Sequence, residues 1–262
     1  MSRRLCGVVV AATLVLAGCG SGGQTSTSPT SGSEAPKVTG DVTVFAAASL
    51  TETFTQLGKD FEAANPGTKV KFNFAGSSAL AQQLNQGAPA DVFASAAPAN
   101  MKQVTDTKTV TDTPTTFVRN KLAIAVPKGN PGKIAGLADF ANADKKIALC
   151  AEQVPCGAAA KKVFEVAKVT PQPDTLEQDV KAVLTKVSLG EVDGALVYKT
   201  DVKAAGGKVE GIDFAEADQA VNDYPIAPLA KAPNAAAAKA FVDFVLSDKG
   251  KAVLSAAGFV SP

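Results

Sequence analysis

The sequence predicts an α/β protein, because short strand-like runs alternate with amphipathic helical patterns from about residue 40 to the end of the chain. The first apolar run covers residues 42–45, and a helical pattern follows it directly. Ser49 and Glu52 have the spacing of a capping box at the start of this helix. Its apolar face is formed at helical spacing by Leu50, Phe54, Leu57 and Phe61.

The remaining elements continue the alternation. Further strands are expected at residues 69–74, 91–94, 122–126, 147–150 and 194–198. Further helices are expected to begin at Gly76 and after Gly157, and to cover residues 176–189, 235–246 and 249–256. Four of the six expected strands are followed by a helix before the next strand, which is the pattern of sheets packed between helices.

Residues 1–19 have the features of a secretion signal. Arg3 and Arg4 precede an apolar stretch at residues 8–15, which is too short to span a bilayer permanently. The closing Leu16-Ala17-Gly18-Cys19 resembles the lipobox of bacterial lipoproteins. That resemblance implies that Cys19 is acylated and becomes the first residue of the mature chain. An ordinary cleaved signal without acylation is the alternative.

Residues 20–37 are expected to form a flexible linker, because they are mostly Gly, Ser, Thr, Gln and Pro and bury too little apolar surface to offset the entropy of ordering. Residues 38–262 are enough for one large domain or two ordinary ones.

The composition excludes several classes of function. The 26 basic and 25 acidic residues give a net charge of +1 without a basic stripe, so nucleic acid is not an expected partner. The chain has no histidine, which removes Ser-His-Asp catalysis, Cys-His catalysis and most zinc chemistry. The acidic residues do not have metal-ligand spacing. We therefore expect neither an enzyme nor a cofactor, and no direct metal-cation ligands.

Two cysteines remain for the folded part, because Cys6 leaves with the signal and Cys19 is assigned to the lipid. Cys150 and Cys156 are six positions apart, which indicates a disulfide in an oxidising compartment outside the cytoplasm. Two buried free thiols are the alternative.

Three segments share one design, in which a strand ends in small residues and turns directly into a helix. They are residues 46–49, 75–78 and 154–157. Each turn places unpaired backbone N–H groups at a helix start, where the helix dipole also attracts anions. None of the three contains Lys or Arg, so they predict a site of neutral donors for a small anion. Taken singly, each serine in these turns is explained equally well as a helix cap.

Several short motifs also occur in a fixed order along residues 41–262. They are residues 44–50, 74–81, 87–96, 154–157, 179–180, 197–198 and 224–226. This ordered set resembles the periplasmic molybdate-binding proteins. The resemblance implies a two-lobed periplasmic binding protein fold of type II, in which two α/β domains joined by two crossover strands hold an oxyanion in the cleft between them. Lobe 1 would comprise residues 38–119 and 228–262, and lobe 2 residues 120–227.

The resemblance further implies which residues contact the ion. In lobe 1 these are Ser49 and Ser77, through hydroxyl and backbone N–H. In lobe 2 they are the backbone N–H groups of Cys156 and Val180 and the hydroxyl of Tyr198. Many family members have Ala at the position of Cys156, a difference that a main-chain contact should tolerate. Without the resemblance, Val180 and Tyr198 read as residues of an apolar core.

The ligand implied is molybdate or tungstate, which the sequence does not distinguish. The implied partners are an ABC transporter permease with its ATPase, and the membrane through the lipid anchor. The protein would act as a monomer on the extracytoplasmic face of the cell membrane. Many members also have Ser where this chain has Gly76, a difference expected to matter little because Ser77 is retained.

Three other functions remain open from the sequence. One is a receptor for another tetrahedral oxyanion, such as sulfate or a phosphonate. Another is a secreted serine hydrolase that uses Ser49 or Ser77, although neither lies in a Gly-x-Ser-x-Gly elbow. The third is a structural envelope lipoprotein without a ligand.

Overall fold

The computed structural model describes residues 38–262. The predicted signal at residues 1–19, the acylation of Cys19 and the linker at residues 20–37 all lie outside the described residues.

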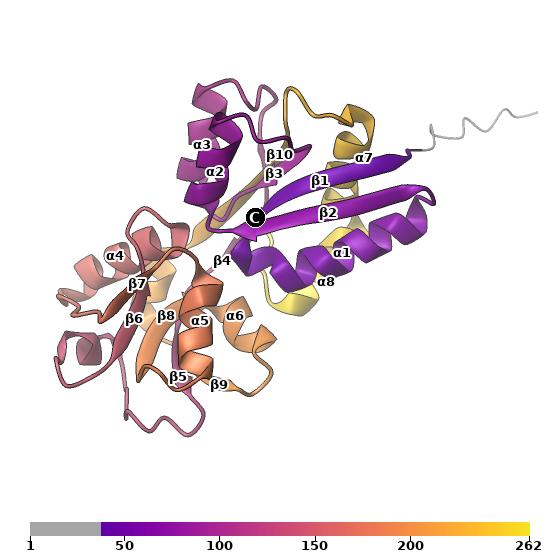
Figure 1. Cartoon of the computed structure of the whole chain (residues 1–262). Coiled ribbons are helices and arrows are strands. Elements are labelled where there is room, and N and C mark those ends of the chain that lie inside the picture. Colours follow the sequence, from indigo (N-terminus) through magenta and orange to yellow (C-terminus); the bar gives the residue numbers. More distant parts are fainter. Residues whose placement is uncertain (1–37) are drawn as a thin grey trace, which may run out of the picture. The chain divides into compact units, whose positions relative to one another are not determined.

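The described chain alternates between strands and helices as the sequence predicts (Figure 1). In chain order the elements are β1 (Gly40–Ala47), η1 (Ala48–Leu50), α1 (Thr51–Ala64), β2 (Thr68–Ala75), α2 (Ser77–Asn85), β3 (Val92–Ala94), α3 (Pro98–Asp106), β4 (Thr115–Asn120), β5 (Leu122–Pro127), η2 (Leu137–Ala141), β6 (Ile147–Cys150), α4 (Pro155–Ala167), β7 (Thr175–Glu177), α5 (Val180–Ser188), β8 (Gly194–Tyr198), α6 (Lys199–Ala204), β9 (Val209–Ile212), η3 (Ala215–Gln219), β10 (Asn222–Pro228), α7 (Ala235–Leu246) and α8 (Asp248–Ala257).

The strands form two five-stranded sheets with the same plan. The first has the order β2-β1-β3-β10-β4 and the second the order β7-β6-β8-β5-β9. In each sheet the first three strands are parallel and the last two join in antiparallel fashion. We refer to the first sheet with α1, α2, α3, α7 and α8 as lobe 1, and to the second sheet with α4, α5 and α6 as lobe 2.

The chain crosses between the sheets twice. Lys121 alone separates β4 of the first sheet from β5 of the second, and the chain returns where β10 begins at Asn222. Residues 222–227, which we expected in lobe 2, pair with the strands of lobe 1. The two crossings therefore lie next to each other, with Asn120 and Asn222 paired in register.

The sheet of lobe 1 is covered on both faces, because its side chains alternate between two cores. Val42, Val44 and Ala46 pack against α1, α7 and α8, whereas Phe45 and Phe93 pack against α2 and α3. Lobe 2 has one extended core made largely of aliphatic residues from β5, β6, β8, α4 and α5. This layering places the carboxyl ends of β1, β2, β6, β7 and β8 directly before helix starts, where α/β proteins bind ligands.

Two local predictions were wrong. The capping box at Ser49 does not form, because the chain enters α1 through the 3-10 turn η1 and the Ser49 hydroxyl is bonded to a residue distant in sequence. The helix predicted over residues 176–189 begins only at Val180, since Leu176 belongs to β7 and is exposed at the edge of its sheet. Aliphatic spacing alone does not separate a short edge strand from the first turn of a helix.

Within residues 38–262, no helix is both long enough and apolar enough to cross a membrane.

Candidate functional site

All five residues expected to contact an oxyanion line one small hollow where the two lobes meet. Ser49 and Ser77 come from lobe 1, and Cys156, Val180 and Tyr198 come from lobe 2. The other lining residues are Ala47, Ala48, Ala75, Gly76, Ala96, Val154, Pro155 and Asp179. Every lining segment except Ala96 lies at the end of a strand or at the start of the helix that follows it.

Ser49 lies in η1, where its side chain is 4% exposed. Its Oγ is 3.0 Å from the hydroxyl oxygen of Tyr224 on β10, and either hydroxyl can be the donor. Burial raises the pKa of Tyr224, so its hydroxyl keeps its proton. When Tyr224 donates to Ser49, the serine hydrogen is left available for another acceptor.

Ser77 begins α2, and its hydroxyl is oriented in a similar way by a neighbour. The backbone N–H of Ala96 donates to Ser77 Oγ at 3.0 Å in a fully buried contact. With one lone pair occupied, the Ser77 O–H is free to donate. The first backbone N–H groups of α2 have no helical partner, and no side chain of residues 38–262 caps them.

The start of α4 supplies main-chain donors from lobe 2. Pro155 stands at the first helical position and has no N–H, while the N–H of Ala158 already donates to Val154. Among residues 38–262, the amides of Cys156 and Gly157 therefore have no acceptor. Gly157 leaves no room for a side chain, since a Cβ there would lie 2.0 Å from the carbonyl oxygen of Ala151.

The predicted disulfide between Cys150 and Cys156 is confirmed, with the two Cα atoms 5.7 Å apart. It joins the last residue of β6 to the first turn of α4. Both cysteines are buried, so the bridge belongs to the core of lobe 2. The amide of Cys156 is thereby tied to the sheet through its own side chain.

The start of α5 presents a single amide, because a side chain occupies the others. The carboxylate of Asp179 accepts from the N–H groups of Lys181 at 2.8 Å and Ala182 at 2.9 Å. The N–H of Val180 has no acceptor within residues 38–262 and is at the wall of the hollow. Asp179 therefore occupies the amides of Lys181 and Ala182 and leaves that of Val180 free to donate to a ligand.

Tyr198 ends β8, and its ring is 1% exposed. Its hydroxyl oxygen is buried and has no hydrogen-bond partner among the described residues. Burial, with Tyr224 and Asp201 nearby, raises the pKa of Tyr198 well above its usual value. Tyr198 is therefore a protonated donor without an acceptor among the described residues, and an unpaired buried hydroxyl is costly.

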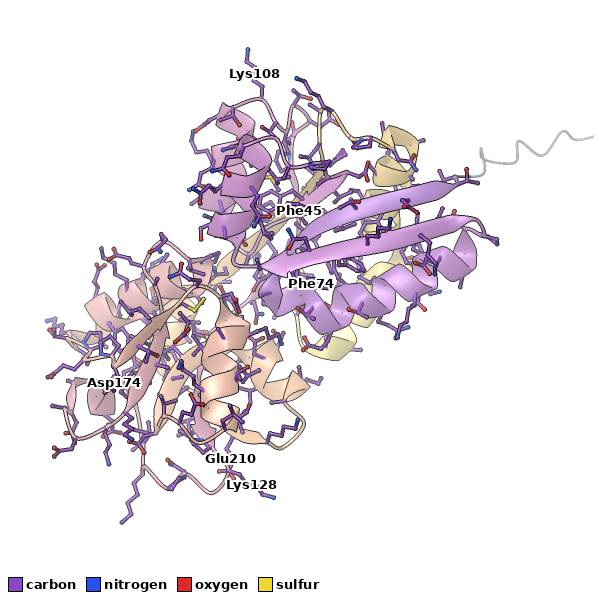
Figure 2. The ribbon with its side chains drawn as sticks, in the orientation of Figure 1. Phe45, Phe74, Lys108, Lys128, Asp174 and Glu210 are labelled. Atoms are coloured by element: carbon purple, nitrogen blue, oxygen red, sulfur yellow. A yellow bond between two sulfur atoms is a disulfide. The ribbon has the colours of Figure 1, made fainter. Side chains whose placement is uncertain are left out.

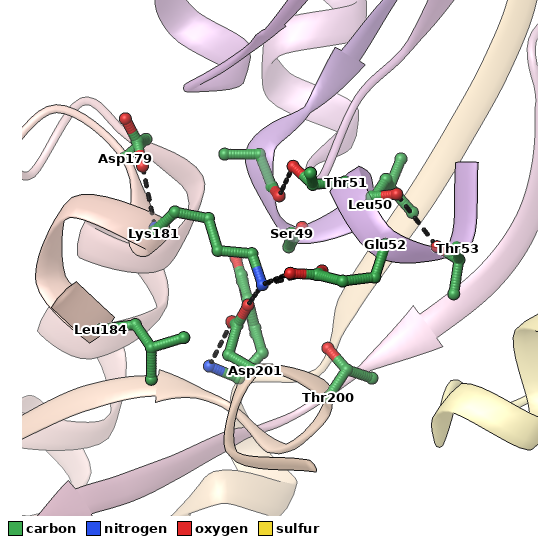
Figure 3. Close-up of polar contacts among 12 residues, drawn as sticks. Ser49, Leu50, Thr51, Glu52, Thr53, Asp179, Lys181, Leu184, Thr200 and Asp201 are labelled. Atoms are coloured by element: carbon green, nitrogen blue, oxygen red, sulfur yellow. Dashed lines mark hydrogen bonds and ion pairs between the residues drawn. The ribbon is translucent and has the colours of Figure 1, made fainter. Parts of the chain in front are cut away.

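The hollow is lined without a basic side chain, judging from residues 38–262. Lys181, Glu52 and Asp201 form ion pairs beside it rather than in its wall (Figure 3). What faces the hollow is a set of hydroxyl and amide hydrogens at helix starts, which favours an anion. The described residues contain no cluster of three or more His, Cys, Asp or Glu side chains that could hold a metal cation.

A larger groove, of about 610 Å³, lies along α4 and the segment that leads to β7. Its wall is mostly apolar and open, and it holds none of the hydroxyl donors of the site. Convergence of polar groups, not size, therefore identifies the functional hollow.

The sequence did not reveal two features of the site. Tyr224 was part of a motif but was not assigned a role, although its hydroxyl holds Ser49. Gly76 was expected to matter little, but a Cβ at this position would lie 2.2 Å from the carbonyl oxygen of Gln178 in lobe 2. The absence of a side chain at Gly76 therefore allows the lobes to approach this closely.

The family model for bacterial extracellular solute-binding proteins matches residues 42–260. The molybdate-binding protein ModA of Mycobacterium tuberculosis is 39% identical over 262 residues, which cover 100% of this chain and 98% of the relative. The Bacillus subtilis protein YvgL, whose name describes an ABC transporter substrate-binding lipoprotein, is 30% identical over 95% of this chain and 94% of its own length. Among solved structures, the periplasmic molybdate-binding protein of Azotobacter vinelandii has a TM-score of 0.73 at 22% identity, covering 84% of this chain and 99% of that one.

Proposed function

The chain belongs to the family of bacterial extracellular solute-binding proteins, and from this premise we propose that it captures molybdate, or the closely similar tungstate, and delivers it to an ABC-type membrane transporter. The observation that carries the proposal is the convergence of Ser49, Ser77, Cys156, Val180 and Tyr198 on one hollow. A full-length relative that is named for molybdate binding supports the choice of ion.

The size of the hollow suits a compact ion. The hollow is far smaller than a site for a drug-sized ligand, which leaves room only for a compact ion.

The chemistry of the wall suits a dianion. Hydrogen bonds to a charged acceptor are stronger than neutral ones, so five or more neutral donors can replace the hydration of the ion without a counter-charge. Because the backbone donors are held by helix starts and by the Cys150–Cys156 bridge, little ordering entropy is lost when the ion arrives.

Selectivity would have two physical sources. Sulfate has shorter bonds to its oxygens than molybdate, so a hollow matched to molybdate leaves sulfate oxygens short of some donors. Phosphate near neutral pH keeps a proton and would bring a hydrogen to a wall made of hydrogens. Both differences disfavour the wrong ion without any repulsive charge.

The binding cycle would involve no covalent chemistry. The ion bridges donors of both lobes and thereby favours the state in which they are together, and that state is what the transporter would recognise. Acylation of Cys19 would keep the protein at the extracytoplasmic face of the membrane, within reach of the permease and its ATPase. We expect it to act as a monomer.

Titration calorimetry with molybdate, tungstate, sulfate and phosphate tests this function. We expect tight binding of the first two and weak or absent binding of the others. Equal affinity for sulfate would favour the alternative of a general tetrahedral-oxyanion receptor. Labelling by a fluorophosphonate at Ser49 or Ser77 would instead indicate a serine hydrolase. No heat and no thermal stabilisation with any of the four anions would reject a site for these ions.

A further inference from the structure

Three charged side chains meet beside the hollow without lining it (Figure 3). Lys181 Nζ is 2.9 Å from a carboxylate oxygen of Glu52 and 2.9 Å from Oδ1 of Asp201. Glu52 belongs to α1 in lobe 1, whereas Lys181 and Asp201 belong to α5 and α6 in lobe 2. The group therefore joins the two lobes at the edge of the site.

Each of the three residues follows one of the proposed donors closely in sequence. Glu52 lies in the first turn of α1, three residues after Ser49. Lys181 follows Val180 directly, and Asp201 accepts the backbone N–H of Tyr198 at 3.1 Å through its second oxygen. Movement of any of these charges is therefore coupled to movement of a donor.

The three side chains differ in burial, which separates their roles. The Asp201 side chain is 0% exposed and that of Lys181 is 22% exposed, whereas that of Glu52 is 54% exposed. Asp201 and Lys181 belong to one lobe, so their pair persists when the lobes separate. Among these three side chains, only the contact of Lys181 with Glu52 must form when the lobes meet.

We propose that Glu52 closes an ionic latch on the Lys181–Asp201 pair when the lobes come together, and that this latch sets how long a captured ion stays bound. The proposal rests on the binding cycle given above and adds positioning residues that do not touch the ion. The helix-start donors recognise the ion, and the latch slows the opening that precedes its release.

The charge on Lys181 is secure in this setting. Burial lowers the pKa of Lys181, but the neighbouring carboxylates of Asp201 and Glu52 together raise it by more than burial lowers it. The net shift of the pKa is upward. The lysine thus remains a cation over the physiological range. Two other hydrogen bonds join the lobes, from Asn120 to the Thr200 hydroxyl and from Lys203 to the carbonyl of Ala256. Both acceptors are neutral and neither bond involves Glu52, so neutralising Glu52 leaves both bonds in place.

The chain provides its own reporter for release. It has no tryptophan and only two tyrosines, Tyr198 and Tyr224, whose rings are 6.0 Å apart beside the hollow. Tyrosine fluorescence therefore reports the site alone, and stopped-flow mixing of the molybdate-loaded protein with a chelating competitor measures the release rate directly.

Glu52→Gln should speed release about fivefold, the value expected for a partly exposed ion pair, with the association rate unchanged or slightly higher. The matched control is Asp106→Asn, which neutralises a carboxylate in the Lys102–Asp106 pair within α3 and should leave release within twofold. Added salt should speed release from the wild type but not from Glu52→Gln. A release rate for Glu52→Gln equal to that of the wild type would overturn the latch.

A double-mutant cycle with Lys181→Met provides the second test, because Lys181→Met removes the cation that Glu52 contacts. That variant also leaves Asp201 without its cation, so the double variant is compared with Lys181→Met and not with the wild type. Adding Glu52→Gln to Lys181→Met should produce no further increase in the release rate, whereas independent, multiplying effects would overturn the proposal.

Measuring the distance between the lobes without any ligand separates a failure of the latch from a failure of the proposed binding function. Lys108 in lobe 1 and Lys128 in lobe 2 both point into solvent (Figure 2), so spin labels at Lys108→Cys and Lys128→Cys report the distance between lobes. Glu52→Gln should shift this distribution toward longer distances even if no oxyanion binds. Coincident distributions for the wild type and Glu52→Gln, in both the absence and the presence of molybdate, would reject the latch.

Discussion

Replacing Tyr198 by Phe removes one oxygen atom from the wall of the hollow and nothing else. In this structure, with the lobes together, that oxygen is buried and has no hydrogen-bond partner among residues 38–262. A buried, unsatisfied hydroxyl costs about 1–3 kcal/mol, so its removal should leave the free energy of unfolding unchanged or raise it.

The effect on binding should have the opposite sign. A hydrogen bond to a charged acceptor contributes about 1.5–3 kcal/mol, which corresponds to a loss of affinity of about 10- to 160-fold. The same substitution therefore raises or preserves the stability of the free protein and weakens the complex. Few residues outside a binding site combine these two effects.

Two measurements on one preparation decide the matter. Urea unfolding of the ligand-free protein measures stability, and titration calorimetry with molybdate measures affinity. A variant that loses stability but retains wild-type affinity would show that Tyr198 is an ordinary core residue, and the second lobe would need a different donor.

Four further results are expected. Gly76→Ala should weaken molybdate binding by about 5- to 160-fold in calorimetry, since overpacking against a backbone carbonyl of lobe 2 costs about 1–3 kcal/mol; an unchanged affinity would mean that the lobes need not approach so closely. Tyr224→Phe should lower the free energy of unfolding by about 0.5–1.5 kcal/mol and weaken binding less than loss of the Tyr198 hydroxyl does, because Tyr224 bonds to a serine and not to the ion. Burial raises the pKa of Asp201 from 3.8 to about 6, so the folded protein binds this proton more tightly than the unfolded chain does. Urea unfolding should therefore show stability falling by about 2 kcal/mol as pH rises from 4 to 6, a slope that Asp201→Asn should lack. Replacing Cys150 and Cys156 together by Ala should lower the free energy of unfolding by about 2 kcal/mol, the value expected for a bridge across so short a loop, and should weaken molybdate binding; equal affinity with and without the bridge would show that α4 is ordered by packing alone.

The fold was largely predictable because most of its elements follow local rules. Residues 147–150 and 194–198 were predicted as strands and are β6 and β8, since runs of consecutive apolar residues mark strands buried on both faces. The helix predicted over residues 235–246 is α7. Small residues at strand ends also indicated the turns that line the hollow, because unpaired amides follow from helix geometry alone.

The missed features all depend on tertiary contacts. Ser49 was assigned to a local cap, but its partner Tyr224 is 175 positions away. Gly76 was judged by its neighbour in sequence, whereas its constraint comes from Gln178 in the other lobe. The pairing of Lys181 with Glu52 likewise spans 129 positions. No periodicity or motif spacing encodes such distances, so these residues become visible only in the folded chain.

Pro155 and Asp179 limit the number of amide hydrogens that lobe 2 presents to the hollow. Pro155 deletes one amide hydrogen from the start of α4, and Asp179 occupies two at the start of α5. A tetrahedral ion has a limited number of lone pairs, and any surplus hydrogen in a dry pocket would remain unsatisfied both with and without the ion. Substituting Pro155 or Asp179 should therefore change how many amide hydrogens lobe 2 presents to the ion.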